Sequence, residues 1–188
     1  MHRIVKTGYI DMAHRIRGHK GKCQCIHGHT WKIELSVSCA DDALDELGMV
    51  LDFTVLKEKF FRHVDACFDH TCLFGKEDWR ELMNLCEPDP HGGRRPTLLK
   101  VGEALGVPER SGVRKPYLGL HGFRSDIANG RLTAETLSKY LYNMALLHLQ
   151  DDRVKVDYVR VYEQLHPTES YAEYRPGKVN NVSSEQAA

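Results

Sequence analysis

Residues 23–31 are Cys-Gln-Cys-Ile-His-Gly-His-Thr-Trp, and a regular alternation begins at the first of the two histidines. From there every second side chain is apolar or an imidazole, and the residues between are small or polar. The inward-pointing series is His27, His29, Trp31, Ile33, Leu35, Val37 and Cys39. A period of two is typical of a strand with one buried face. The pattern therefore places both histidines on the buried face of a strand.

The segment before this stretch has the same alternation and contributes a third histidine. Ile4, Ile10, Met12, His14 and Ile16 share one parity. We predict strands over residues 3–16 and 29–39, joined by a basic loop rich in Gly and Lys. If the two strands pair, three imidazoles converge, and three histidines with an open fourth position are the catalytic zinc arrangement. The alternative is three ordinary histidines, but unpaired buried imidazoles are costly. We predict a Zn²⁺ site at His14, His27 and His29.

Two cysteines precede the histidine pair. Cys23 lies in the loop, four residues before His27, where Lys20, Lys22 and a metal cation favour a reactive thiolate that acts as nucleophile or base. Cys25 is nearer to the histidines and is a candidate metal ligand. The spacing alone does not separate these two roles.

These residues, with others in the same order along the chain, resemble the 6-pyruvoyltetrahydropterin synthase superfamily. The gap between Cys23 and His27 is similar to that of its bacterial branch, the 6-carboxytetrahydropterin synthases. The resemblance covers residues 1–75 and 131–175. It is carried by His14, Cys23-x-x-x-His27-Gly28-His29, Val50-Leu51-Asp52-Phe53 with Leu56-Lys57, Phe68-Asp69-His70-Thr71-Cys72-Leu73, Leu132-Thr133-Ala134-Glu135 and Val159-Arg160-Val161-Tyr162-Glu163.

The chain departs from the family pattern in four places. Trp31 stands where Tyr or Phe is usual, and Phe74 where Asn is usual. Cys25 is extra, and residues 75–130 form a much longer segment than the family normally has there.

The resemblance implies an α+β tunnel fold, with an antiparallel four-stranded sheet and two main helices on one face. It also implies a homohexamer, a dimer of trimers whose active sites lie between subunits. For the site, it implies that Cys23 moves protons while Asp69 and His70 act as the complementary acid/base pair. Glu163 would anchor the pterin, with Thr133 and Glu135 nearby.

The implied enzyme is a lyase. It would cleave a carbon–carbon bond in the side chain of 7,8-dihydroneopterin triphosphate, giving 6-carboxytetrahydropterin, acetaldehyde and triphosphate for queuosine biosynthesis. Basic residues of the first loop are candidates to hold the triphosphate, namely Arg15, Arg17, Lys20 and Lys22. The alternatives are 6-pyruvoyltetrahydropterin synthesis, dihydroneopterin side-chain cleavage, and a zinc-handling paralogue with more than one zinc per chain and little turnover. An RNA- or nucleotide-binding module that uses arginines of the 75–130 segment is a further alternative.

The composition is that of an ordinary globular domain. The chain has 188 residues, 41% of them apolar, and 26 basic residues balance 26 acidic ones. Balanced charge gives no reason to expect nucleic acid or a membrane surface as a partner, and no run is long enough to span a bilayer. The N-terminus is strand-like, and six cysteines without a CxxC pair indicate reduced thiols. We therefore expect a cytoplasmic protein.

The remaining elements complete the order β-β-α-insertion-α-β. Helical spacing over residues 53–67 follows a good N-cap, Asp52, and a second helix starts at Thr133. We expect a strand over residues 154–163 and a fourth strand within 168–175. One domain covers residues 1–175, with an irregular insertion at about 75–130 that serves as a lid, an oligomer contact or surface elaboration, and a flexible tail at 176–188. Cys39 and Cys67 fall on apolar faces and are most simply core residues. His148 lies at core spacing, and we expect it to be packed or partly exposed rather than a ligand.

Overall fold

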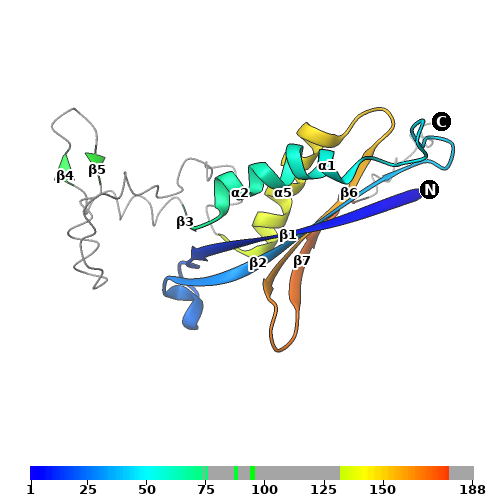
Figure 1. Ribbon diagram of the computed structural model, residues 1–188. Helices are drawn as coiled ribbons and strands as arrows, with labels where there is room; N and C mark the ends of the chain where they lie inside the picture. The colour runs from blue at the N-terminus through cyan, green and yellow to red at the C-terminus, as the bar shows by residue number, and fades with distance from the viewer. Residues whose placement is uncertain (74, 76–86, 89–93, 96–131, 178–188) are drawn as a thin grey trace, which may run out of the picture.

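The computed structural model describes residues 1–73, 75, 87, 88, 94, 95 and 132–177. A five-stranded sheet organises this part of the chain, with strand order β3-β1-β2-β6-β7 (Figure 1). The neighbouring pairs β1–β2, β2–β6 and β6–β7 are antiparallel. These strands are β1 (His2–His14), β2 (His27–Cys39), β6 (Lys155–Gln164) and β7 (Ser170–Tyr174). The α+β class and the long β1–β2 pair agree with the sequence prediction.

The predicted sheet lacked one strand. β3 (Thr71–Leu73) follows the first helical segment and runs parallel to the last three residues of β1. The described sheet therefore has five strands and is mixed, where four antiparallel strands were expected. A strand of three residues is too short to produce a visible period of two, which is why the sequence pattern did not predict it.

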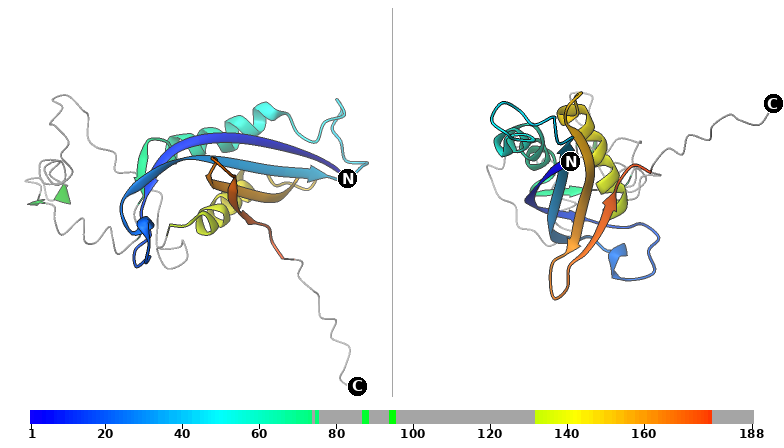
Figure 2. Two further views of the ribbon diagram at one scale, coloured as in Figure 1. Left: turned by 90° about the horizontal axis from the view of Figure 1, so that it is seen from below. Right: turned by 90° about the vertical axis from the view of Figure 1, so that its right-hand side faces the viewer.

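Two helical segments cover the same side of the sheet (Figure 1). The first is continuous and consists of α1 (Phe53–Leu56), the π-helical η2 (Lys57–Phe61) and α2 (Arg62–Phe68). The second is α5 (Ala134–Leu149). Figure 2 shows the first segment near the β1 side of the sheet and α5 over β6 and β7.

Both predicted helix starts are confirmed by their caps. The Asp52 carboxylate accepts a hydrogen bond from the backbone N–H of Thr54 at 2.6 Å. Thr133 and Thr136 form a reciprocal capping box at the start of α5. Because these side chains satisfy the first free N–H groups, each helix begins where the sequence predicts.

The hydrophobic core lies between this helical layer and the sheet. The inward face of β2 is fully buried from Trp31 to Val37, as its alternation predicts. The helices contribute residues at 3.6-residue spacing, and each such side chain stabilises the fold by about 1.5–3 kcal/mol. The helical core residues include Leu56, Phe60, Val64, Leu137, Leu141 and Ala145.

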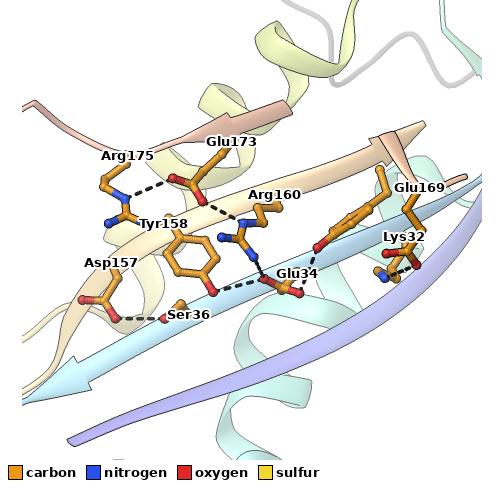
Figure 3. A network of polar contacts seen from close by, with 10 residues as sticks. Lys32, Glu34, Ser36, Asp157, Tyr158, Arg160, Glu169, Glu173 and Arg175 are labelled. Atoms are coloured by element: carbon orange, nitrogen blue, oxygen red, sulfur yellow. Dashed lines mark hydrogen bonds and ion pairs between the residues drawn. The ribbon is translucent and has the colours of Figure 1, made fainter. Parts of the chain in front are cut away.

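The opposite face of the sheet is polar, and its charges are paired (Figure 3). Glu34 on β2 accepts hydrogen bonds from the Tyr158 hydroxyl at 3.1 Å, the Arg160 guanidinium at 2.9 Å and the Tyr162 hydroxyl at 3.2 Å. Arg160 also donates to Glu173 on β7 at 2.7 Å. The uncovered face is therefore an ordered hydrogen-bond network across β2, β6 and β7.

Most of the predicted insertion lies outside the described residues. Of the segment 75–130 the structure describes Gly75 and two short antiparallel strands, β4 (Glu87–Pro88) and β5 (Arg94–Arg95). The predicted tail lies outside them from residue 178 onward. Among the described helices, none is both long and apolar enough to cross a membrane.

Candidate metal centre

The register of β1 and β2 brings the three predicted histidines together. His14 pairs directly with His27, and Met12 pairs with His29, so all three imidazoles lie on the face that carries Trp31. The ring centroids of His14 and His27 are 4.6 Å apart, those of His27 and His29 are 4.9 Å apart, and those of His14 and His29 are 5.6 Å apart. The sequence prediction that these rings converge is confirmed.

Backbone carbonyls orient two of the rings. The Nδ1 atom of His14 lies 3.1 Å from the carbonyl oxygen of Leu132, and Nδ1 of His27 lies 2.8 Å from that of Cys25. A carbonyl oxygen can only accept, so Nδ1 carries the proton in both rings. The Nε2 lone pair is then free to bind a metal, which is the usual arrangement around metal-binding histidines.

A carboxylate joins the cluster. Oε1 of Glu163 lies 3.1 Å from Nε2 of His14 and 3.7 Å from Nε2 of His29. Neither contact has hydrogen-bond geometry, so both Nε2 atoms are buried without a hydrogen-bond partner among the described residues. Buried polar atoms in such a position call for a ligand.

The donor set fits a transition metal. One ligand atom each from His14, His27, His29 and Glu163 lies within 4.8 Å of the other three. Around a tetrahedral zinc with Zn–N bonds of about 2.0–2.1 Å, neighbouring ligand atoms are about 3.3 Å apart. A small contraction of the cluster therefore suffices to surround a cation.

The pKa values of two members of the cluster, His29 and Glu163, are shifted in the direction that suits metal binding. Burial lowers the pKa of His29, and the neighbouring His14 and His27 lower it further, against the opposing charge of Glu163. The adjacent His14 ring holds the pKa of Glu163 below its ordinary value, against the effect of burial. A neutral imidazole beside an ionised carboxylate is the combination that a metal ion needs.

A pocket of about 360 Å³ opens beside the cluster. It brings together Cys23, His29, Glu135 and Glu163, and its other lining residues are Ala134, Gln164, Ser170, Tyr171 and Ala172. Cys23 lies in the short 3₁₀ helix η1 (Lys22–Gln24), and its carbonyl oxygen accepts a hydrogen bond from the Ile16 N–H at 2.7 Å. The Cys25 thiol is exposed and lies outside the His/Glu cluster.

Asp69 and His70 form a pair at a different place, the turn between α2 and β3. Nδ1 of His70 lies 2.7 Å from Oδ2 of Asp69, and His70 adopts a positive φ of 55°, which lets adjacent side chains meet. The other Asp69 oxygen accepts from the Asp11 N–H at 2.8 Å. That bond is the main reason why the pKa of Asp69 is lowered, and the hydrogen bond to Asp69 raises the pKa of His70. The His70 side chain is 80% exposed, and neither residue lines the Cys23 pocket.

Comparison with known proteins identifies the family of this chain. The family model described as 6-pyruvoyl tetrahydropterin synthase matches residues 3–177. The chain belongs to this family.

Similar members of the 6-pyruvoyl tetrahydropterin synthase family come from bacteria. The 6-carboxy-5,6,7,8-tetrahydropterin synthase of Haemophilus influenzae is 29% identical over 181 residues, 93% of this chain and 99% of the relative. The protein of the same name from Rickettsia typhi is 43% identical over 69 residues, 37% of this chain and 49% of the relative. The chain therefore spans about half the length of this relative and of several others that it matches.

Solved structures confirm the tunnel fold. An uncharacterized protein from Wolinella succinogenes aligns with a TM-score of 0.62 and 20% identity, over 94% of this chain and 98% of that one. The 6-pyruvoyl tetrahydropterin synthase of Plasmodium vivax aligns with a TM-score of 0.51 and 17% identity, over 93% and 98% of the two chains.

Sequence reasoning missed several parts of this family member's site. Glu163 shares its parity with Val159 and Val161, but its closeness to the histidines follows only once β6 is known to lie beside β2. The carbonyl groups of Cys25 and Leu132 leave no signal in the sequence, because any residue supplies one. Thr133, predicted near the pterin, caps α5 in the structure and does not line the pocket.

Proposed function

We propose that this protein is a zinc-dependent 6-carboxy-5,6,7,8-tetrahydropterin synthase. It would convert 7,8-dihydroneopterin triphosphate to 6-carboxytetrahydropterin, acetaldehyde and triphosphate. The 6-carboxytetrahydropterin would then serve queuosine biosynthesis in the cytoplasm. The observation that supports the proposal most is the cluster of His14, His27 and His29, because His29 also lines a pocket together with Cys23 and Glu163.

His14, His27 and His29 would hold the Zn²⁺. When bound, zinc supplies Lewis-acid polarisation of the substrate's side-chain oxygens. The carbonyl groups behind His14 and His27 keep their Nε2 atoms directed at one point, so the protein pre-organises the site before the metal arrives.

Glu163 would recognise the pterin ring. The 2-amino group and the adjacent ring N–H of a pterin are two parallel donors, and a carboxylate offers two matching acceptors. The lowered pKa of Glu163 keeps it ionised at neutral pH, which makes these hydrogen bonds charge-assisted. Glu135, at the first turn of α5, lines the same pocket and would contact the ring from the other element. Thr133 would contribute indirectly, because it caps α5 and so fixes the start of the helix that carries Glu135.

Cys23 would act as the base that moves protons on the substrate side chain. Its backbone is fixed by the Ile16 hydrogen bond, and its side chain borders the pocket beside His29. The loop residues Arg15, Arg17, Lys20 and Lys22 would hold the triphosphate, because they surround the entry to η1 with positive charge.

Asp69 and His70 would complete the site from a neighbouring subunit of a homohexamer. Two observations support this part of the proposal. The pair is exposed and lies outside the pocket of its own chain. β3 covers only the last three residues of β1, so most of the β1 edge is free within the described chain to pair with another strand.

The test of the reaction is anaerobic incubation of the zinc-loaded protein with 7,8-dihydroneopterin triphosphate, with the products identified by mass. We expect acetaldehyde and 6-carboxytetrahydropterin. Formation of 6-pyruvoyltetrahydropterin, or of a dihydropterin that has lost its side chain, would assign one of the alternative reactions. Tight zinc binding with no turnover would indicate the zinc-handling paralogue.

The test of the shared site is complementation between two inactive variants. We expect Cys23→Ala and His70→Ala each to be inactive alone, and a mixture that is dissociated and reassembled to regain part of the activity. A mixture that stays inactive while mixed oligomers form would contradict a site shared between subunits.

A further inference from the structure

A second group of metal-ligating side chains lies on the helical layer, away from the metal centre described above. His63 and Cys67 are one turn apart on α2, so they project from the same face of the helix. His148, in the last turn of α5, faces them, with its ring centroid 5.7 Å from that of His63. This separation is close to the 5.6 Å between His14 and His29 in the first centre.

The distance between the first two donors suits a shared cation. Sγ of Cys67 lies 3.5 Å from Nε2 of His63. With Zn–S bonds of about 2.3 Å and Zn–N bonds of about 2.0–2.1 Å, tetrahedral geometry places sulfur and nitrogen about 3.5 Å apart. The two side chains are thus already spaced as neighbouring ligands of one metal ion.

The third donor has room to move into place. His148 is exposed and borders a groove of about 690 Å³ that His63 and Met144 also line. The three donors do not yet form one compact group, because among the described residues the only such group is the one at His14. A side-chain rotation of an exposed histidine is a small cost compared with the strength of a metal–imidazole bond.

The character of the donors indicates which cations they would bind. One thiolate and two imidazoles select borderline or soft transition metals, and they disfavour Mg²⁺ and Ca²⁺, which prefer oxygen ligands. Met144, one turn before His148 on α5, places a thioether in the same groove, which suits the same class of metal.

We propose that His63, Cys67 and His148 form a second metal site that binds Zn²⁺ or a similar transition-metal cation and links α2 to α5. The sequence favoured a packed or partly exposed His148 over a ligand, and the structure places it at the surface, with its ring close to that of His63. Burial raises the pKa of the Cys67 thiol, which favours its protonated form in the metal-free protein, where Sγ makes a weak hydrogen-bond contact with Nε2 of His63. A bound cation displaces that proton, as metals do at other thiolate sites.

The test is a zinc titration of reduced, metal-free protein against a chromophoric chelator. We expect the wild-type chain to bind two Zn²⁺ ions, and His148→Ala to bind one. The second binding constant should fall by more than about 100-fold, because even residues that only support a ligand contribute 10–100-fold. Cys67→Ser should bind one ion as well, and with Co²⁺ it should lose the thiolate charge-transfer absorption of this site.

Two control variants test whether other histidines or thiols of the chain bind the second ion. His166→Ala removes an exposed histidine from the turn between β6 and β7 and should leave both ions bound. Cys25→Ala should also leave both, whereas loss of the second ion there would assign it to the Cys23–Cys25 loop and overturn the proposal. A wild-type chain that stops at one ion, or a second ion that survives both His148→Ala and Cys67→Ser, would overturn it too. None of these results depends on the catalytic activity, so the proposal stands or falls separately from the proposed function.

Discussion

Replacing Glu163 with Gln tests what the carboxylate beside the histidines does. The two side chains have nearly the same shape, so the change removes the charge and turns one acceptor into a donor. Glu163 lines the pocket and has a lowered pKa, so the wild-type group is an anion with two acceptor oxygens. In the variant, one of the two pterin donors would meet an N–H group instead of an oxygen.

The size of the effect follows from the hydrogen bonds that are lost or weakened. The variant loses one hydrogen bond to a charged group, worth about 1.5–3 kcal/mol, leaves that buried pterin donor unpaired, at about 1–3 kcal/mol, and weakens the second bond by removing its charge, so the total cost is about 3–6 kcal/mol. At about 1.4 kcal/mol per factor of ten, kcat/KM for 7,8-dihydroneopterin triphosphate should fall by about 10²–10⁴-fold. Zinc binding should change by less than about tenfold, because three oriented imidazoles remain, the number of protein ligands usual at catalytic zinc sites.

The assay measures kcat/KM and zinc affinity on the same preparations. Glu169→Gln is a matched control, since Glu169 is an exposed glutamate directly before β7 that pairs with Lys32. It should leave both quantities near their wild-type values. If Glu163→Gln lost its zinc, the carboxylate would be a metal ligand rather than the pterin anchor. If it kept both its zinc and a kcat/KM within tenfold of wild type, the reasoning on pterin recognition would be refuted.

Three further predictions concern groups outside the pocket. Arg160→Ala should lower the free energy of unfolding by about 2–3 kcal/mol in urea denaturation. The variant leaves Glu34, whose side chain is 13% exposed, without its cationic partner. An unchanged midpoint would contradict a structural role for the hydrogen-bond network around Glu34. Arg153→Met should cost about 2–3 kcal/mol in the same assay, because the Nη1 group donates to three backbone carbonyls, those of residues 43, 49 and 50, and the variant removes all three hydrogen bonds. Asp69→Asn should lower the NMR titration midpoint of His70 toward the ordinary histidine pKa, since the hydrogen bond to Asp69 raises the pKa of His70. A midpoint that does not move would show that the pair is not formed in solution. The stability from this pair is present between the two shifted pKa values, is lost as pH rises through the raised pKa of His70, and is lost as pH falls through the lowered pKa of Asp69.

The parts of the fold that have a strong period were predictable from the sequence. β1, β2, β6 and both helical segments each extend over ten residues or more, and each alternates or repeats according to its own geometry. The convergence of the three histidines followed from parity plus the assumption that neighbouring strands pair. β3 was not predictable in this way, because its three residues derive their strand structure from pairing with β1 rather than from their own pattern.

The site was predictable only where function depends on side-chain type and position along a strand. The position of Glu163 depends on β6 lying beside β2, a pairing across more than 100 residues. The carbonyl contacts that orient His14 and His27 depend on backbone conformation alone. His148 lies at the core spacing of α5, from which we expected a packed or partly exposed side chain, and the structure places it at the surface.

The metal centre and the hydrophobic core depend on the same strand register. The pairing that sets His14 opposite His27 also sets Ile10 opposite Trp31, and it continues without interruption to His2 and Cys39. A slip of one residue would turn the buried face of β2 outward, which includes four fully buried side chains from Trp31 to Val37. At about 1.5–3 kcal/mol per side chain, that slip costs about 6–12 kcal/mol, which is comparable to the whole stability of a typical domain. The core therefore holds the imidazoles together before any cation arrives, and the metal-free protein should remain folded, unlike a zinc finger, whose fold depends on its metal.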